Sequence, residues 1–199
     1  MRANNTGMPH AVSVPPAVVL CTLNAKYIHA SLGLRYLLAN MGDLRARTSL
    51  REYTIARDPQ QVAQELVELL GPQVDGQTQV IGLGVYIWNV TQTCEVVRLL
   101  KSQRPDIKVV LGGPEVSHEV NEQEIVRLAD HVITGWGDTS FATLARQLLC
   151  GERPAGKVIA GIQAPLPALT LPYREFTDED VRQRHLYVEA SRGCPFKCE

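Results

Sequence analysis

Short, continuous apolar runs alternate with helix-patterned segments along most of this sequence. Residues 17–21, 80–85 and 107–111 form such runs, as expected of strands whose two faces are both buried. Apolar residues at helical spacing follow each run, near residues 34–41, 62–70, 94–100, 125–129 and 141–149. Strands that alternate with helices form right-handed βαβ units, so this order predicts a parallel sheet with helices on both faces.

Weaker patterns complete the predicted sheet. Residues 44–50 alternate apolar with polar positions, which is typical of an edge strand with one wet face. Asp58-Pro59 predicts a helix start, and residues 131–134 and 158–159 predict two short strands. The expected fold is therefore α/β, with a doubly wound parallel sheet of five or six strands. We expect it to be flavodoxin-like or Rossmann-like, in the order 2-1-3-4-5.

Composition divides the chain into four parts. Residues 1–16 mix Asn, Thr, Gly, Pro and His without an apolar stretch, which predicts a disordered tail and not a signal peptide. Residues 17–160 carry the strand–helix alternation and form the expected domain. Prolines interrupt residues 161–185, which predicts a linker that is mobile beyond Pro165. Residues 186–199 open with a strand-like run at 186–190 that we expect to begin a second domain.

Charge and cysteine usage limit the partners and the compartment. The formal net charge is −1, which gives no electrostatic reason to expect a nucleic acid or an anionic membrane as a partner. No apolar run has the length of a membrane span. Cys21, Cys94 and Cys150 stand singly in apolar segments, as small buried residues do in a reducing compartment. We therefore expect a cytoplasmic protein.

The segments that follow the predicted strands carry the candidate site. In a doubly wound sheet, ligands bind at the carboxyl ends of the strands. Four such segments, 22–33, 86–93, 112–118 and 135–140, are rich in Gly, Asn, Ser and Thr, and they also hold two Trp and two Tyr residues. Such loops suit a large, flat, mostly neutral ligand better than a polyphosphate. The G-x-G-x-x-G fingerprint of a dinucleotide site is missing from the first of them, which disfavours a plain nucleotide-binding Rossmann domain.

Two loop histidines are candidate metal ligands. His29 and His118 follow predicted strands, and a neutral imidazole in such a place can coordinate a metal. A loop histidine that is hydrogen-bonded to the backbone or to water is the more common arrangement, and it is the one expected for both.

Read together, these loops resemble the N-terminal cobalamin-binding domains of cobalamin-dependent radical-SAM enzymes. The resemblance lies in Asn-Ala-Lys-Tyr-Ile-His-Ala-Ser-Leu-Gly at 24–33, Tyr-Ile-Trp-Asn at 86–89 with Thr91, and Gly-Gly-Pro-Glu at 112–115. Near the end, Arg-Gly-Cys-Pro-Phe-Lys-Cys at 192–198 resembles the start of the radical-SAM motif C-x-x-x-C-x-x-C.

The resemblance implies cobalamin as a cofactor and assigns residues to it. The implied cobalamin-binding residues are Asn24, Ala30, Ser31, Gly33, Gly84, Tyr86, Trp88, Asn89, Thr91, Gly112, Gly113, Pro114, Glu115, Gly135, Trp136 and Gly137. It also implies that Cys194 and Cys198 ligate a [4Fe–4S] cluster in a longer parent, where the cluster binds S-adenosylmethionine. The third cysteine of the motif would fall two residues beyond Glu199, so we expect a chain cut inside the motif. In the parent, the radical-SAM barrel of the same chain would be the domain's partner.

This sequence departs from the D-x-H-x-x-G motif by which other cobalamin-dependent enzymes supply a histidine to cobalt. Tyr27 stands where the Asp should be and Leu32 where the Gly should be, so His29 is not expected to ligate cobalt. The related S-x-L element would map to Gly84-x-Tyr86, which lacks the serine hydroxyl.

The resemblance implies that the parent is an enzyme, whereas this fragment alone is not expected to be one. A parent that performs radical methyl transfer is the leading hypothesis. An oxidative cyclase of the anaerobic magnesium-protoporphyrin monomethyl ester type shares the same pair of domains and stays open. A non-catalytic module that senses cobalamin or another flat ligand is the alternative from another class, and the two cysteines after Arg192 count against it.

Overall fold

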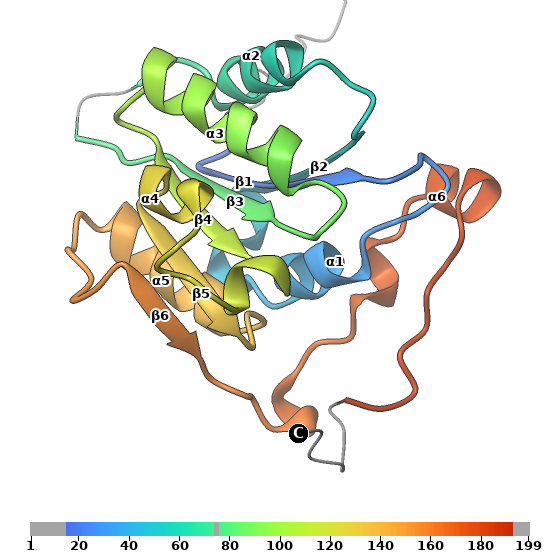
Figure 1. Ribbon diagram of the computed structural model, residues 1–199. Coiled ribbons are helices and arrows are strands. Elements are labelled where there is room, and N and C mark those ends of the chain that lie inside the picture. Colours follow the sequence, from blue (N-terminus) through green and yellow to red (C-terminus); the bar gives the residue numbers. More distant parts are fainter. Residues whose placement is uncertain (1–14, 74–75, 193–199) are drawn as a thin grey trace, which may run out of the picture.

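The protein is built on one six-stranded sheet in which every strand runs parallel to its neighbours (Figure 1). This computed structural model describes residues 15–73 and 76–192. The strands are β1 (Val18–Asn24), β2 (Thr48–Thr54), β3 (Val80–Gly84), β4 (Lys108–Gly112), β5 (His131–Gly135) and β6 (Val158–Gly161). Their order, β2-β1-β3-β4-β5-β6, confirms the predicted flavodoxin-like order and adds β6 at the far edge.

Helices cover both faces of the sheet (Figure 1). The helices α2 (Pro59–Leu70), α3 (Val90–Gln103) and α4 (Glu124–Leu128) lie on one face. The helices α1 (Leu32–Ala39) and α5 (Ser140–Leu149) lie on the other. The start of α2 is the predicted one, because the Asp58 carboxylate accepts a hydrogen bond from the Gln60 N–H at 3.0 Å. Among the described residues, no helix is long and apolar enough to cross a membrane.

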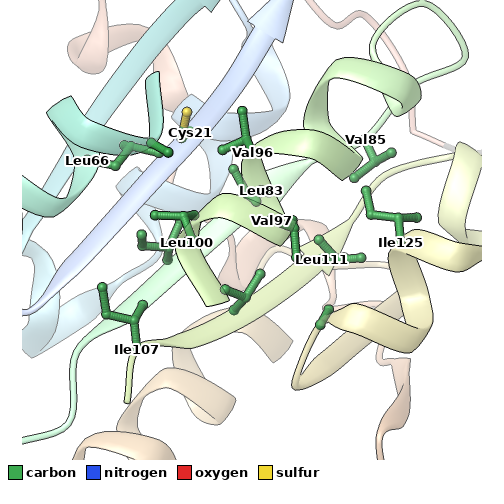
Figure 2. Packing of buried hydrophobic residues seen from close by; sticks show 14 of the residues in the cluster. Cys21, Leu66, Leu83, Val85, Val96, Val97, Leu100, Ile107, Leu111 and Ile125 are labelled. Carbon is green, nitrogen blue, oxygen red and sulfur yellow. The ribbon is translucent and has the colours of Figure 1, made fainter. Parts of the chain in front are cut away.

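Alternate residues of the central strands supply two separate cores. In β1, Val19 and Cys21 face α2 and α3, whereas Val18 and Leu20 face α1 and α5. Figure 2 shows the larger core, in which side chains of α3 such as Leu100 pack onto the sheet. Both faces of the central strands are buried, which explains why their sequences are apolar at nearly every position.

The predicted first edge strand begins later than expected. Residues 44–47, predicted as part of it, belong to the 3-10 helix η1 (Gly42–Arg47), and β2 starts at Thr48. Gly42 has a positive φ of 57°, which turns the chain sharply after α1. The Thr48 hydroxyl then donates a hydrogen bond to the Leu44 carbonyl at 2.8 Å and closes this short helix.

Residues 162–192, called the C-terminal segment below, pack against the sheet domain where a mobile linker was expected. The segment contains η3 (Leu166–Ala168), η4 (Pro172–Glu175) and α6 (Asp178–Gln183). The run 186–190, predicted as a strand, forms none, and only His185 makes an isolated bridge, to His29. Cys194, Cys198 and residues 1–14 of the predicted tail lie outside the described residues.

Candidate functional site

A cavity of about 210 Å³ lies at the carboxyl ends of β3, β4 and β5, between α1 and α5. Its walls come from Gly33, Leu34, Leu37, Gly82, Leu83, Gly84, Tyr86, Val110, Leu111, Gly112, Gly113, Ile133, Gly135, Trp136, Gly137, Asp138 and Phe141. This is the edge where the loop-borne site was predicted, and it adjoins the point where the strand order reverses between β1 and β3.

Two glycines at this edge let other parts of the chain approach the strands closely. A Cβ atom at Gly82 would lie 2.6 Å from the Phe141 ring, so the ring rests directly on the sheet. Gly113 has a φ of 115°, and a Cβ there would lie 2.3 Å from the Val85 carbonyl oxygen. At these two positions any larger residue would displace its neighbour or strain the backbone.

Half of the residues assigned from the resemblance line this cavity and half do not. Those that line it are Gly33, Gly84, Tyr86, Gly112, Gly113, Gly135, Trp136 and Gly137. Those that lie elsewhere are Asn24, Ala30, Ser31, Trp88, Asn89, Thr91, Pro114 and Glu115.

Two asparagines of the second group hold the loops in shape. The fully buried Asn89 side chain donates to the carbonyls of Leu23 at 2.9 Å and Gly84 at 3.2 Å, and it accepts from the Tyr86 N–H at 2.8 Å. Asn24 donates to the His29 carbonyl at 2.7 Å and to the Glu52 carboxylate at 2.9 Å. Their amides are used within the protein, so they support the site without facing the cavity.

Other residues of the second group lie around the cavity or away from it. The Trp88 ring stacks on Tyr86, with centroids 4.5 Å apart and planes 7° apart, so Trp88 adds an apolar surface outside the cavity. Ser31 caps α1 by accepting from the Leu34 N–H at 3.3 Å. Thr91 and Glu115 line a different hollow, between α3 and the loop before α4.

Sequence reasoning missed these further residues that line the cavity: Leu34, Leu37, Gly82, Leu83, Val110, Leu111, Ile133, Asp138 and Phe141. Most of them look like ordinary core residues in a sequence. Gly82 carried a usable signal, because a glycine inside an otherwise apolar strand often marks a close approach of another group.

Asp138 ties the C-terminal segment to the mouth of the cavity. Its carboxylate accepts from the Arg192 guanidinium at 2.6 Å, and both side chains are nearly buried. The same guanidinium lies 3.9 Å above the Tyr36 ring and bonds Glu189 at 2.6 Å. Burial lowers the pKa of Arg192, but its bonds to Asp138 and Glu189 more than offset this, so the pKa stays above its ordinary value.

A second ion cluster, with buried side chains, holds the C-terminal segment at the carboxyl end of β2. Arg35 contacts Glu52 at 2.9 Å and Asp180 at 2.8 Å, and Arg184 contacts Glu52 at 2.6 Å. All four side chains are less than a tenth exposed. Two cations and two anions balance each other, as a buried cluster requires.

Both carboxylates of this cluster stay ionised. Burial alone raises the pKa of Glu52, but the charge of Arg35 and bonds from Arg35, Asn24 and the Ser31 N–H bring it below its ordinary value. The pKa of Asp180 is also lowered, because the Thr177 N–H and Arg35 outweigh its burial.

The two candidate histidines stand outside the cavity. His29 bonds the Tyr187 hydroxyl through Nδ1 at 2.5 Å, and its ring lies against His185. His118 is exposed in the loop after β4. Within the part of the chain that the structure describes, neither joins a group of side chains able to hold a metal.

Taken together, the parallel sheet and the glycine-lined cavity at its carboxyl edge define a doubly wound α/β domain that binds a ligand beside the strand-order switch. Residues 18–145 match the B12 binding domain family. The chain therefore belongs to this family, and its ligand is cobalamin.

Known proteins with similar sequences are methyltransferases. The 2-(S-pantetheinyl)-carbapenam-3-carboxylate methyltransferase of Streptantibioticus cattleyicolor is 28% identical over 144 residues, which cover 60% of this chain and 21% of that protein. The cobalamin-dependent radical SAM methyltransferase TokK of Streptomyces tokunonensis is 28% identical over 165 residues, covering 68% and 24%. This chain thus spans about a quarter, or less, of the length of these relatives.

A solved structure has the same fold. The radical S-adenosylmethionine methyltransferase TsrM of Kitasatospora setae, with cobalamin and a [4Fe–4S] cluster bound, superposes with a TM-score of 0.50 at 18% identity. The superposition covers 71% of this chain and 26% of TsrM. TsrM with its tryptophan substrate and an analogue of S-adenosylmethionine gives the same TM-score.

Proposed function

We propose that this chain is the cobalamin-carrying part of a radical-SAM methyltransferase. The observation that carries the proposal is the glycine-lined cavity in a member of the B12 binding domain family. Two relatives with similar sequences are named as methyltransferases, one of them cobalamin-dependent, which favours methyl transfer for a longer parent.

In this proposal the nucleotide tail of cobalamin enters the cavity between α1 and α5. The glycines at the strand ends would let a flat heterocycle reach the sheet. Gly33, Gly84, Gly112 and Gly113, which the resemblance assigns to cobalamin, line this cavity, whereas Asn24, Ala30 and Ser31 do not. The corrin ring would rest outside the cavity on Tyr86, Trp88 and Trp136.

Cobalamin supplies the chemistry of methyl transfer, and the residues of this chain bind and orient it. The cofactor is expected in its base-off form, with its tail detached from cobalt. His29 is not expected to bind cobalt in this proposal, because its ring bonds Tyr187 and lies outside the cavity.

The rest of the machinery belongs to the proposed parent. Cys194 and Cys198 would be two of three thiolate ligands of a [4Fe–4S] cluster that binds S-adenosylmethionine. The radical-SAM barrel of the same chain would cover the upper face of the corrin. For residues 1–199 tested by themselves, we expect micromolar or weaker affinity for cobalamin.

Titration with hydroxocobalamin, followed by its visible spectrum, tests the proposal. The wild type should give a base-off spectrum. Gly112→Val should weaken binding at least about tenfold, because Gly112 faces the cavity and has space for a side chain that would fill it. Gly156→Val is the matched control, since Gly156 also has ordinary space around it but lies far from the cavity.

The outcome against the proposal is an unchanged cobalamin spectrum at millimolar concentration with the wild type. Equal binding by Gly112→Val and Gly156→Val would remove the cavity as the site. His29→Ala should keep the base-off spectrum, and its loss would identify His29 as a cobalt ligand.

A further inference from the structure

We propose that the cavity selects the cofactor by its lower base, favouring cobamides with an apolar base over those with a purine. This inference rests on the proposed binding of the tail in the cavity, and it names the class of cofactor that the site prefers. The preference follows from what the deep part of the cavity offers to a heterocycle.

The side chains that reach the deep part are apolar. Leu34 and Leu37 of α1 form one wall, and Phe141 of α5 forms the other. Val110 and Ile133 form the floor on neighbouring strands, and the Phe141 ring covers Gly82 beside them. None of these six side chains has a hydrogen-bonding atom.

Polar side chains stand only at the mouth among the described residues that line the cavity. They are Tyr86, Trp136 and Asp138, all on the loops after β3 and β5. The hydroxyl of Tyr86 lies beside Gly33 at the start of α1, and the Asp138 carboxylate is paired with Arg192 at 2.6 Å. A base that reaches the sheet passes beyond these groups.

The backbone N–H and C=O groups of the strands beneath the base already have hydrogen-bond partners. Gly82 and Val110 pair with each other in the parallel ladder, and Gly82 pairs with Leu20 on its other side. The N–H and C=O groups of these residues lie in the plane of the sheet and bond the neighbouring strands. Gly82 and Val110 therefore present no free backbone donor or acceptor to a ligand lying on them.

Adenine and dimethylbenzimidazole differ in the free energy that it costs to bury them in the cavity. Dimethylbenzimidazole and p-cresol bases present methyl groups and ring carbons, which the leucines and Phe141 can cover. Adenine carries an exocyclic amine and further ring nitrogens, and these would lose water without gaining a partner. One unpaired buried polar group weakens binding roughly tenfold or more.

Binding of four cobamides to the whole chain tests the inference. Cobalamin, the p-cresolyl cobamide, the adeninyl cobamide and tail-less cobinamide are titrated under one condition. Cobalamin and the p-cresolyl form should bind at least about tenfold more tightly than the adeninyl form. Cobinamide should bind most weakly, since it places nothing in the cavity.

A pair of isosteric variants separates the cavity from the rest of the molecule. Val110→Thr adds one hydroxyl to the floor of the cavity. It should reduce several-fold the ratio of the affinity for the p-cresolyl cobamide to the affinity for the adeninyl cobamide. Val109→Thr adds the same hydroxyl one residue away in β4, where the side chain faces the other core, and should leave the preference as in the wild type. The cost of detaching a base from cobalt belongs to the free cofactor, so it cancels between protein variants.

Each other result counts against one of the two proposals. Equal affinity for adeninyl and p-cresolyl cobamides, or equal preferences in Val110→Thr and Val109→Thr, would overturn the selectivity alone. If cobinamide binds as tightly as the p-cresolyl cobamide, the tail does not use the cavity. If no cobamide binds, the proposed function fails with it.

Discussion

Gly113 has a backbone that only glycine adopts without strain. Its φ is 115°, and its Cα lies against the end of β3 so closely that a Cβ would reach within 2.3 Å of the Val85 carbonyl oxygen. Gly113→Ala should lower the free energy of unfolding by about 2 kcal/mol or more, because both the backbone strain and the clash must be relieved. Urea denaturation measures this loss.

Gly151→Ala separates the clash from the effect of backbone conformation. Gly151 also has a positive φ, 75°, but nothing lies within 4 Å of the place where its Cβ would be. Alanine there should cost about 1 kcal/mol. Equal losses at the two glycines would show that the contact with Val85 is unimportant.

Glu52 holds the buried ion cluster together. It receives both guanidinium groups, of Arg35 and Arg184, and the Ser31 N–H at 2.6 Å. Glu52→Gln leaves two buried cations facing only Asp180, so we expect a loss of about 3 kcal/mol in the free energy of unfolding. Glu95→Gln, which breaks an exposed ion pair with Arg98, should change it by less than about 1 kcal/mol.

The contribution of Glu52 should also depend on pH. Its pKa is lower in the folded chain than in the unfolded chain, so the unfolded state takes up the proton first as the pH falls. The stabilisation is complete above the unfolded pKa of about 4.3 and is lost as the pH falls through the folded value. The gap in stability between the wild type and Glu52→Gln should therefore narrow below about pH 4; a constant gap down to pH 2 would contradict the assignment.

Single residues show why the site could be predicted only in part. The glycines and aromatic residues after the strands were visible because they are unusual in loops that merely connect elements. Val110 and Ile133 look like core residues, and they are, since the cavity floor is also a core surface. Asn89 looks like a ligand-binding amide, yet its polar atoms are used by the backbone around it.

At the scale of elements, the C-terminal segment depends on Arg184. Its side chain bonds Glu52 and Asp180, donates to the Tyr27 carbonyl at 2.9 Å, and lies 4.7 Å above the Tyr27 ring. Arg184→Gln should release α6, so that the amides of Val181 and His185 exchange with solvent faster. Hydrogen exchange measures this, and amides of β3 should keep their protection.

Arg182→Gln is the matched control for that experiment. Arg182 lies in the same helix, but it is largely exposed and pairs only with the exposed Asp178 at 3.6 Å. Its replacement should leave exchange unchanged. If both variants exchange alike, the buried cluster does not hold the segment.

Two elements were predicted wrongly for identifiable reasons. Residues 44–47 fit an alternating strand pattern, but the turn at Gly42 and the bond from Thr48 to Leu44 favour a short helix. Residues 186–190 are apolar enough for a strand, yet the bridge at His185 is the last pairing in the described part of the segment. The prolines of residues 161–185 gave no sign that Asp180 and Arg184 meet buried charged partners or that Pro172 is buried.

At the scale of the whole molecule, the order of the sheet followed from a few general rules. Buried strands must lie in the middle, alternating ones at the edge, and parallel crossovers are right-handed. Those rules need only apolar patterns, which the sequence displays. The path of the C-terminal segment depends instead on pairing between distant charges, such as Arg35 with Asp180, and sequence patterns contain no sign of such pairs.

The C-terminal segment connects the two edge strands of the sheet. It leaves β6 at one margin of the sheet and is fastened by Arg184 to Glu52 of β2 at the opposite margin (Figure 1). In an open sheet each outer strand can fray by itself, because only one neighbour holds it. Here, local unfolding of β6 would loosen the segment that carries Arg184, which neutralises the buried Glu52 in β2. The two edge strands should therefore unfold locally together.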